Sequence, residues 1–64
     1  MKIKELRENL GLSQKELADR AGVAQSTVHY IETGRSPEYK TLKKIAKALN
    51  VSVAALDDDA QKAV

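Results

Sequence analysis

The stretch from Gln14 to Gly34 reads QKELADRAGVAQSTVHYIETG, and it predicts two short helices joined by a tight turn. Ser13, just before it, and Glu16 form a capping box, in which each side chain accepts a hydrogen bond from the other residue's backbone N–H and so starts a helix. Gly22 can end this helix in the left-handed conformation, where glycine has no Cβ to clash. The first of the two helices is therefore bounded at both ends by recognisable signals.

The second helix of the pair is predicted from about Ala24 to Thr33, before Gly34. Leu17 and Ala21 give the first helix an inward face, and the small Ala18 lets the second helix cross it closely. Two helices joined by a turn of roughly three residues form a helix-turn-helix. At about 100° per residue, the second helix is expected to turn Ala24, Val28 and Ile31 toward the core.

Three further helices are predicted around this pair. One runs from about Lys2 to Leu10, with Ile3, Leu6 and Leu10 on one face. Another follows Ser36-Pro37 and runs to about Leu49, and Asn50 can end it in the left-handed conformation. A short helix follows, with Ser52 as a candidate N-cap. The inward residues of these last two helices are predicted to be Leu42, Ile45, Ala46, Leu49, Val53 and Leu56. The sequence thus predicts a compact all-α, five-helix domain over residues 1–56 and a short acidic tail over 57–64.

The composition limits both the core and the chemistry. With 64 residues and no Cys, Phe or Trp, the core must come from tightly packed Leu, Ile, Val and Ala. One histidine, no cysteine and no Gly-rich phosphate loop offer no catalytic or metal-binding constellation, so we expect no enzyme, metal or cofactor. No apolar run reaches the roughly 18 residues that span a membrane, and the N-terminus does not resemble a signal peptide. We therefore expect a cytoplasmic protein without membrane contact.

Charge is unevenly distributed along the chain. Residues 57–64 hold Asp57, Asp58 and Asp59 against only Lys62, a net −2, which leaves +4 on residues 1–56 of the overall +2. A small basic body suits a polyanionic partner, because each neutralised phosphate releases counterions. The acidic tail is interpreted as a solubilising segment rather than a cation site, and as a possible attachment point for a protein partner.

The outward face of the predicted second helix of the pair is polar but uncharged. Gln25, Ser26, His29, Tyr30 and Thr33 fall on this face. A merely solvated helix face normally carries Lys and Glu, whereas amide and hydroxyl groups suit base edges in the major groove. The pattern therefore predicts that this helix reads double-stranded DNA.

The chain from Met1 to about Leu56 resembles the phage-repressor/Cro-type, or XRE-like, helix-turn-helix family. Three motifs carry the resemblance: G-L-S-Q-x-E-L-A-x-x-A-G-V from Gly11, S-T-V-x-x-I-E-x-G-R from Ser26, and T-L-x-K-I-A-K-A-L from Thr41. Together they are highly specific, although any one alone would not be. The resemblance implies a lambda-repressor-like fold and a sequence-specific DNA-binding transcriptional regulator, most often a repressor.

The same resemblance assigns roles to individual residues. Gln14 would sit over a phosphate and buttress Gln25, and Arg7 and Glu32 would form a structural ion pair. Base contacts would come from Ala24, Gln25, Ser26, His29 and Tyr30, and backbone contacts from Gln14, Thr27, Arg35, Ser36, Tyr39, Lys40 and Lys43. One departure is Ala24, where the family commonly has a Ser or Thr cap; its methyl group could instead meet a thymine methyl.

Several assignments have alternatives that the sequence leaves open. Tyr30 could be a partly exposed packing residue, His29 a plain surface histidine, and Lys44 and Lys47 a solvated helix face. A protein-binding module of the same fold, such as an antitoxin or a co-activator-like bridge, is the alternative function. We expect a homodimer on a pseudo-palindromic operator. Val51, Val53 and Leu56 would supply the apolar contact surface, unless they only close the core.

Overall fold

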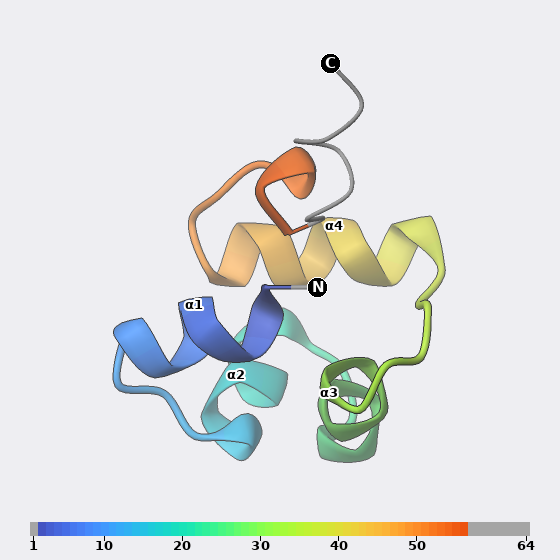
Figure 1. Ribbon diagram of the computed structural model, residues 1–64. Helices are drawn as coiled ribbons and strands as arrows, with labels where there is room; N and C mark the ends of the chain where they lie inside the picture. Colours follow the sequence, from blue (N-terminus) through green and yellow to red (C-terminus); the bar gives the residue numbers. More distant parts are fainter. Residues whose placement is uncertain (1, 57–64) are drawn as a thin grey trace.

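The computed structural model describes residues 2–56, and within them the chain forms four α-helices and one 3₁₀ turn, with no strand. The elements are α1 (Ile3–Asn9), α2 (Gln14–Ala21), α3 (Gln25–Glu32), α4 (Tyr39–Ala48) and η1 (Val53–Leu56) (Figure 1). The all-α fold predicted from the sequence is confirmed. The fifth predicted helix is not, because Val53–Leu56 forms a single 3₁₀ turn, in which the N–H of Ala55 donates to the carbonyl of Ser52. No helix in this described part is long and apolar enough to cross a membrane.

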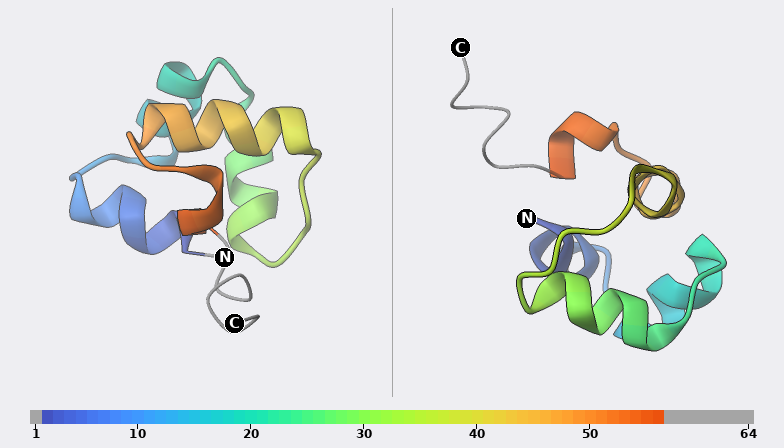
Figure 2. Two further views of the ribbon diagram at one scale, coloured as in Figure 1. Left: turned by 90° about the horizontal axis from the view of Figure 1, so that it is seen from above. Right: turned by 90° about the vertical axis from the view of Figure 1, so that its right-hand side faces the viewer.

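The helices surround one core, with α3 and η1 on opposite sides of it (Figure 2). α2 packs against both α3 and α4, α4 packs against η1, and α1 packs against α3. The backbone N–H of Lys2 donates to the carbonyl of Leu56 at 3.0 Å, which ties the start of α1 to the end of η1. This arrangement leaves one long side of α3 free of other helices.

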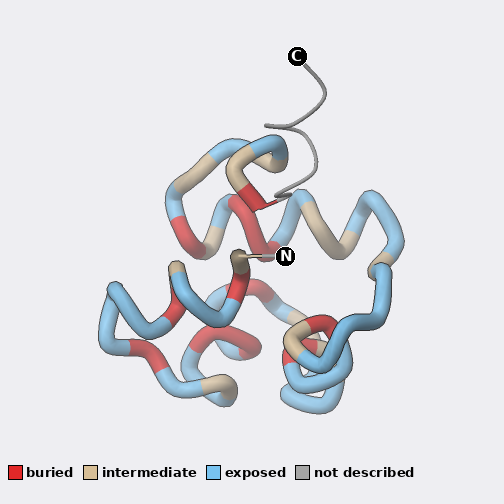
Figure 3. Tube along the Cα trace, viewed as in Figure 1, coloured by how far each residue is buried: buried red, intermediate tan, exposed pale blue. Residues whose placement is uncertain are grey.

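Most of the core is built from the aliphatic residues that the sequence predicts, with Leu12 in place of Leu10. Ile3, Leu17, Val28, Ile45 and Leu56 are fully buried (Figure 3). Leu10 was expected on the inner face of α1 but is 53% exposed, because α1 ends at Asn9 and the helical register stops before it. Leu12 takes the inner position instead and is only 6% exposed.

The ends of the helices follow local backbone chemistry. The capping box is formed: Ser13 Oγ accepts from the N–H of Glu16 at 3.0 Å, and Glu16 Oε1 accepts from the N–H of Ser13 at 2.9 Å. The hydrogen bond from the Ser13 backbone N–H, with a smaller contribution from the Ser13 side chain, holds the pKa of Glu16 below its usual value. After α4, Asn50 takes the predicted left-handed conformation, with φ at 59°.

Candidate nucleic-acid interface

The turn between α2 and α3 fixes the angle between the two helices. Gly22 has φ at 71°, in the left-handed region. The N–H of Val23 donates to the carbonyl of Ala18 at 3.0 Å, and the N–H of Gly22 donates to that of Asp19. Together these two bonds form a Schellman motif, which closes α2 and redirects the chain. Ala18 is 2% exposed, so its small side chain lies within the contact between helices.

The free side of α3 carries the polar residues that the sequence placed there. Val28 and Ile31 point into the core, whereas Gln25, Ser26 and His29 are exposed. Figure 3 shows the same division along α3, with buried positions facing the other helices and exposed ones facing outward. The outward face predicted for this helix is therefore present as a continuous surface.

Ala24 differs from its predicted inward position, because the structure leaves it exposed. It precedes α3 as the N-cap and has an extended backbone, with φ at −71° and ψ at 148°, so the angular spacing of the helix does not extend to it. Its carbonyl accepts from the N–H of Thr27 at 3.0 Å, but its methyl side chain caps nothing. Ala24 thus lies at the exposed start of α3, beside Gln25.

Tyr30 stands at the far end of this surface, and polar groups surround it. Its ring is 52% exposed, with the Arg35 guanidinium carbon 5.5 Å from the ring centroid and the His29 ring centroid 6.0 Å away. The backbone carbonyl of Tyr30 accepts from the Arg35 N–H at 3.0 Å and from Thr33 Oγ1 at 2.9 Å. A cation stacked on an aromatic face restrains both side chains. Tyr30 is therefore half exposed and packs against Arg35 and His29 at the surface of the protein.

The loop after α3 and the start of α4 continue the surface. Ser36 and Lys40 are exposed, and Tyr39 is 65% exposed with Lys43 Nζ 5.6 Å from its ring centroid. Thr27 is half-buried and lines a hollow of about 390 Å³ between α3 and this loop. The other residues around the hollow are Tyr30, Ile31, Arg35, Ser36, Pro37, Glu38 and Thr41.

One feature of this segment was not assigned from the sequence. Glu38 is the N-cap of α4 and places an exposed carboxylate among the basic residues of the loop. The sequence signal for it was the negative charge of Glu38, which lies between the positively charged Arg35 and Lys40. Lys44 and Lys47 are exposed, but they line a separate hollow with Arg20, between the end of α2 and α4. The structure does not bring these two lysines together with the outward residues of α3.

Arg7, Glu32 and Gln14 form a polar network beneath the surface. Glu32 Oε2 accepts from Arg7 Nε at 2.7 Å, while Glu32 Oε1 accepts from Arg7 Nη2 and from Gln14 Nε2, each at 3.1 Å. Arg7 Nη1 also donates to the Leu12 carbonyl at 2.7 Å. One N–H of the Gln14 amide is therefore directed to Glu32, since an ionised carboxylate is a strong acceptor.

Burial and pairing act against each other on this network. The Glu32 side chain is 4% exposed, and burial alone would raise its pKa. Hydrogen bonds from Arg7 and Gln14 outweigh burial and hold the pKa of Glu32 below its usual value. The hydrogen bond to Glu32 likewise raises the pKa of Arg7, against its own desolvation. Both groups are charged at neutral pH.

Comparisons with known proteins agree with this geometry. A helix-turn-helix family model matches residues 3–56. An uncharacterized HTH-type transcriptional regulator of Methanothermobacter thermautotrophicus is 42% identical over 94% of each chain. The Bacillus subtilis HTH-type transcriptional regulator SinR is 40% identical over 91% of this chain, and the cryptic phage CTXphi transcriptional repressor RstR of Vibrio cholerae is 38% identical over 94%.

This chain spans about half the length of SinR and RstR, at 54% and 55% of those proteins. No solved structure matches it significantly. The family match covers α1 through η1, including the turn, the outward face of α3 and the Arg7–Glu32 pair. The chain therefore belongs to the XRE-type helix-turn-helix family, whose members are HTH-type transcriptional regulators.

Proposed function

We propose that this chain binds double-stranded DNA in a sequence-specific manner and regulates transcription, with α3 lying in the major groove. The observation that carries the proposal is the exposed, polar and uncharged face of α3, formed by Gln25, Ser26, His29 and Tyr30 above buried Val28 and Ile31. Gln25 can pair with N6 and N7 of adenine together, and the exposed Ala24 methyl can contact a thymine methyl. The name of RstR, a transcriptional repressor, supports a repressor role, and we place that role in the cytoplasm.

The residues around α3 suit binding to the sugar-phosphate backbone. Arg35, Ser36, Tyr39, Lys40 and Lys43 form an exposed strip along the loop and the start of α4. Arg and Lys side chains and hydroxyls are the usual donors to phosphate oxygens, and such contacts fix the register of a protein on the duplex. The stacking of Arg35 on Tyr30 joins the strip to the base-facing residues.

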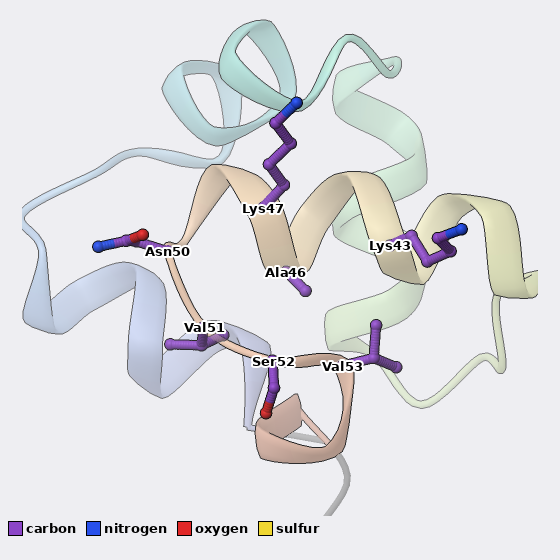
Figure 4. Close-up of a pocket in the computed structure, with 7 residues that line it drawn as sticks. All are labelled: Lys43, Ala46, Lys47, Asn50, Val51, Ser52 and Val53. Carbon is purple, nitrogen blue, oxygen red and sulfur yellow. The ribbon is translucent and has the colours of Figure 1, made fainter.

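We also propose that two copies bind one operator. Val51 and Val53 are half-buried beside a hollow of about 570 Å³, which also includes Ala46, Lys43 and Lys47 (Figure 4). Leu56 is fully buried, so it closes the core and is not part of this surface, which corrects its assignment to self-association. A symmetric pair would place its α3 helices about 34 Å apart, one helical turn of DNA.

Selection of bound DNA from a random duplex pool tests this proposal directly. The purified full chain at moderate salt is expected to enrich an inverted repeat with half-sites one helical turn apart. Enrichment of a single half-site would support base reading but contradict the dimer. No enrichment by a folded chain would contradict the proposed function and favour a protein-binding module of the same fold.

A further inference from the structure

The charge of Glu32 determines which way the Gln14 amide faces. An ionised carboxylate has only acceptors, so Gln14 must turn its nitrogen, and not its oxygen, toward Glu32. Glu32 is held in place by Arg7 from α1 and is almost fully buried, so the direction is set from within the protein. Without this carboxylate, both orientations of the amide would be open to Gln14.

The amide nitrogen of Gln14 has a second N–H that this contact does not use. A side-chain amide carries two donors, and within residues 2–56 the bond to Glu32 is the one hydrogen bond of the Gln14 side chain. Gln14 is half-buried at the first position of α2, where backbone N–H groups also point out of the helix end. The partial positive charge of a helix N-terminus favours an anion at this place.

We propose that Glu32 is a positioning residue for DNA: by accepting one N–H of Gln14, it presents the other N–H of that amide to a backbone phosphate. The proposal rests on the DNA-binding function proposed above. It assigns Glu32 an effect on one phosphate contact, in addition to the stability that its pairing with Arg7 provides. Because phosphates are alike in every sequence, the contact changes affinity and not base preference.

A scan with single methylphosphonate substitutions tests this step. Each phosphate of a selected duplex is replaced in turn by an uncharged methylphosphonate, and affinity is measured for wild type, Gln14→Ala, Glu32→Gln and Lys40→Ala. Among the phosphates that affect binding, we expect one whose replacement lowers the affinity of wild type and of Lys40→Ala alike, by about two- to tenfold. The same phosphate is expected to have a smaller effect on Gln14→Ala and on Glu32→Gln, because the end of α2 still favours an anion there but the Gln14 N–H no longer reaches it.

The reason lies in the hydrogen bonds that Glu32→Gln leaves. Arg7 has only donors, so the new amide turns its oxygen to Arg7 and its NH₂ toward Gln14. Gln14 then turns its own amide oxygen toward residue 32 or loses its hydrogen bond to that residue. Its N–H groups are then no longer directed at the backbone phosphate. If the role of Glu32 were only structural, Glu32→Gln would weaken all phosphate contacts together. Replacement of this phosphate would then still lower the affinity of that variant.

The outcomes separate this proposal from the function on which it rests. Failure of the folded wild type to bind any selected duplex removes the proposed function. Two outcomes overturn the positioning role alone. In one, replacement of the phosphate lowers the affinity of Glu32→Gln as much as that of wild type. In the other, no phosphate distinguishes wild type from Gln14→Ala. Should Glu32→Gln not fold, proton NMR of the wild type decides: one Gln14 side-chain amide proton should be shifted downfield before DNA is added, and an unshifted pair contradicts the proposal.

Discussion

Ala24 leaves the start of α3 without a side-chain cap. Its backbone already has the extended N-cap conformation, with ψ at 148°, but its methyl group cannot accept the N–H bonds at the start of α3. The residue is exposed beside Gln25, on the side that we propose meets DNA. A hydroxyl at this position would therefore cap α3 without any change in backbone conformation.

Ala24→Ser is accordingly expected to raise the free energy of unfolding by about 0.5–2 kcal/mol, because the serine oxygen can cap the first turn of α3. Denaturant unfolding followed by circular dichroism measures this change. Ala24→Val, which adds no acceptor and is as poor an N-cap as alanine, serves as the matched control. If the denaturant midpoint of Ala24→Ser is unchanged or lower, the backbone N–H groups at the start of α3 gain nothing from a serine cap, which contradicts this prediction.

The Arg7–Glu32 pair acts at the scale of elements, because it joins α1 to the last turn of α3. Three hydrogen bonds converge on the Glu32 carboxylate, and Arg7 also donates to the carbonyl of Leu12, where the chain leaves α1. Removal of one partner leaves a charge in a buried place without compensation, which costs more than the pair itself contributes.

Glu32→Ala is expected to lower the free energy of unfolding by about 3 kcal/mol and to leave base preference unchanged. Thermal melting and selection from a random duplex pool measure the two effects. Glu5→Ala, which removes an exposed carboxylate from α1, is expected to melt close to the wild type. A wild-type melting temperature for Glu32→Ala would contradict the structural role of the pair.

At this same scale, the sequence predicts elements better than it predicts their side-chain partners. Helix bounds agree to within a few residues because the capping box and Gly22 are local signals. Leu10 was misplaced because its spacing from Ile3 and Leu6 fits one helical face, whereas α1 ends at Asn9 and Leu10 is its C-cap. The partner of Gln14 depends on which residue α3 brings near it, and 18 positions separate Gln14 from Glu32, so no local pattern contains it.

At the scale of the whole molecule, a core of about a dozen aliphatic side chains supports the surface of α3. The fold ties its ends together through Lys2 and Leu56 and places α4 across α2. The predicted acidic tail, residues 57–64, lies outside the described residues. With so small a core, the paired carboxylate of Glu32 has a visible effect on the stability of the whole chain.

Stability is expected to fall as pH drops through and below the usual range of glutamate. The pKa of Glu32 is lower in the folded chain than in the unfolded chain, so the unfolded chain takes up protons first and acid favours unfolding. The stabilisation is fully present above the pKa that Glu32 has in the unfolded chain, and it is lost as pH falls through the pKa of Glu32 in the folded chain. Melting temperatures of wild type and Glu32→Gln between about pH 6 and pH 3 should converge, and parallel curves would contradict this.

The central claim is that the outward face of α3 reads bases, and parallel selections with wild type, Gln25→Ala and Lys44→Ala test it most directly. The three chains are taken through the same random duplex pool. We expect Gln25→Ala to lose preference at one base pair of each half-site and keep the others, since a bidentate contact contributes about 1–3 kcal/mol of discrimination. Lys44→Ala, on a separate surface, should select the wild-type sequence. An unchanged motif for Gln25→Ala would contradict the claim.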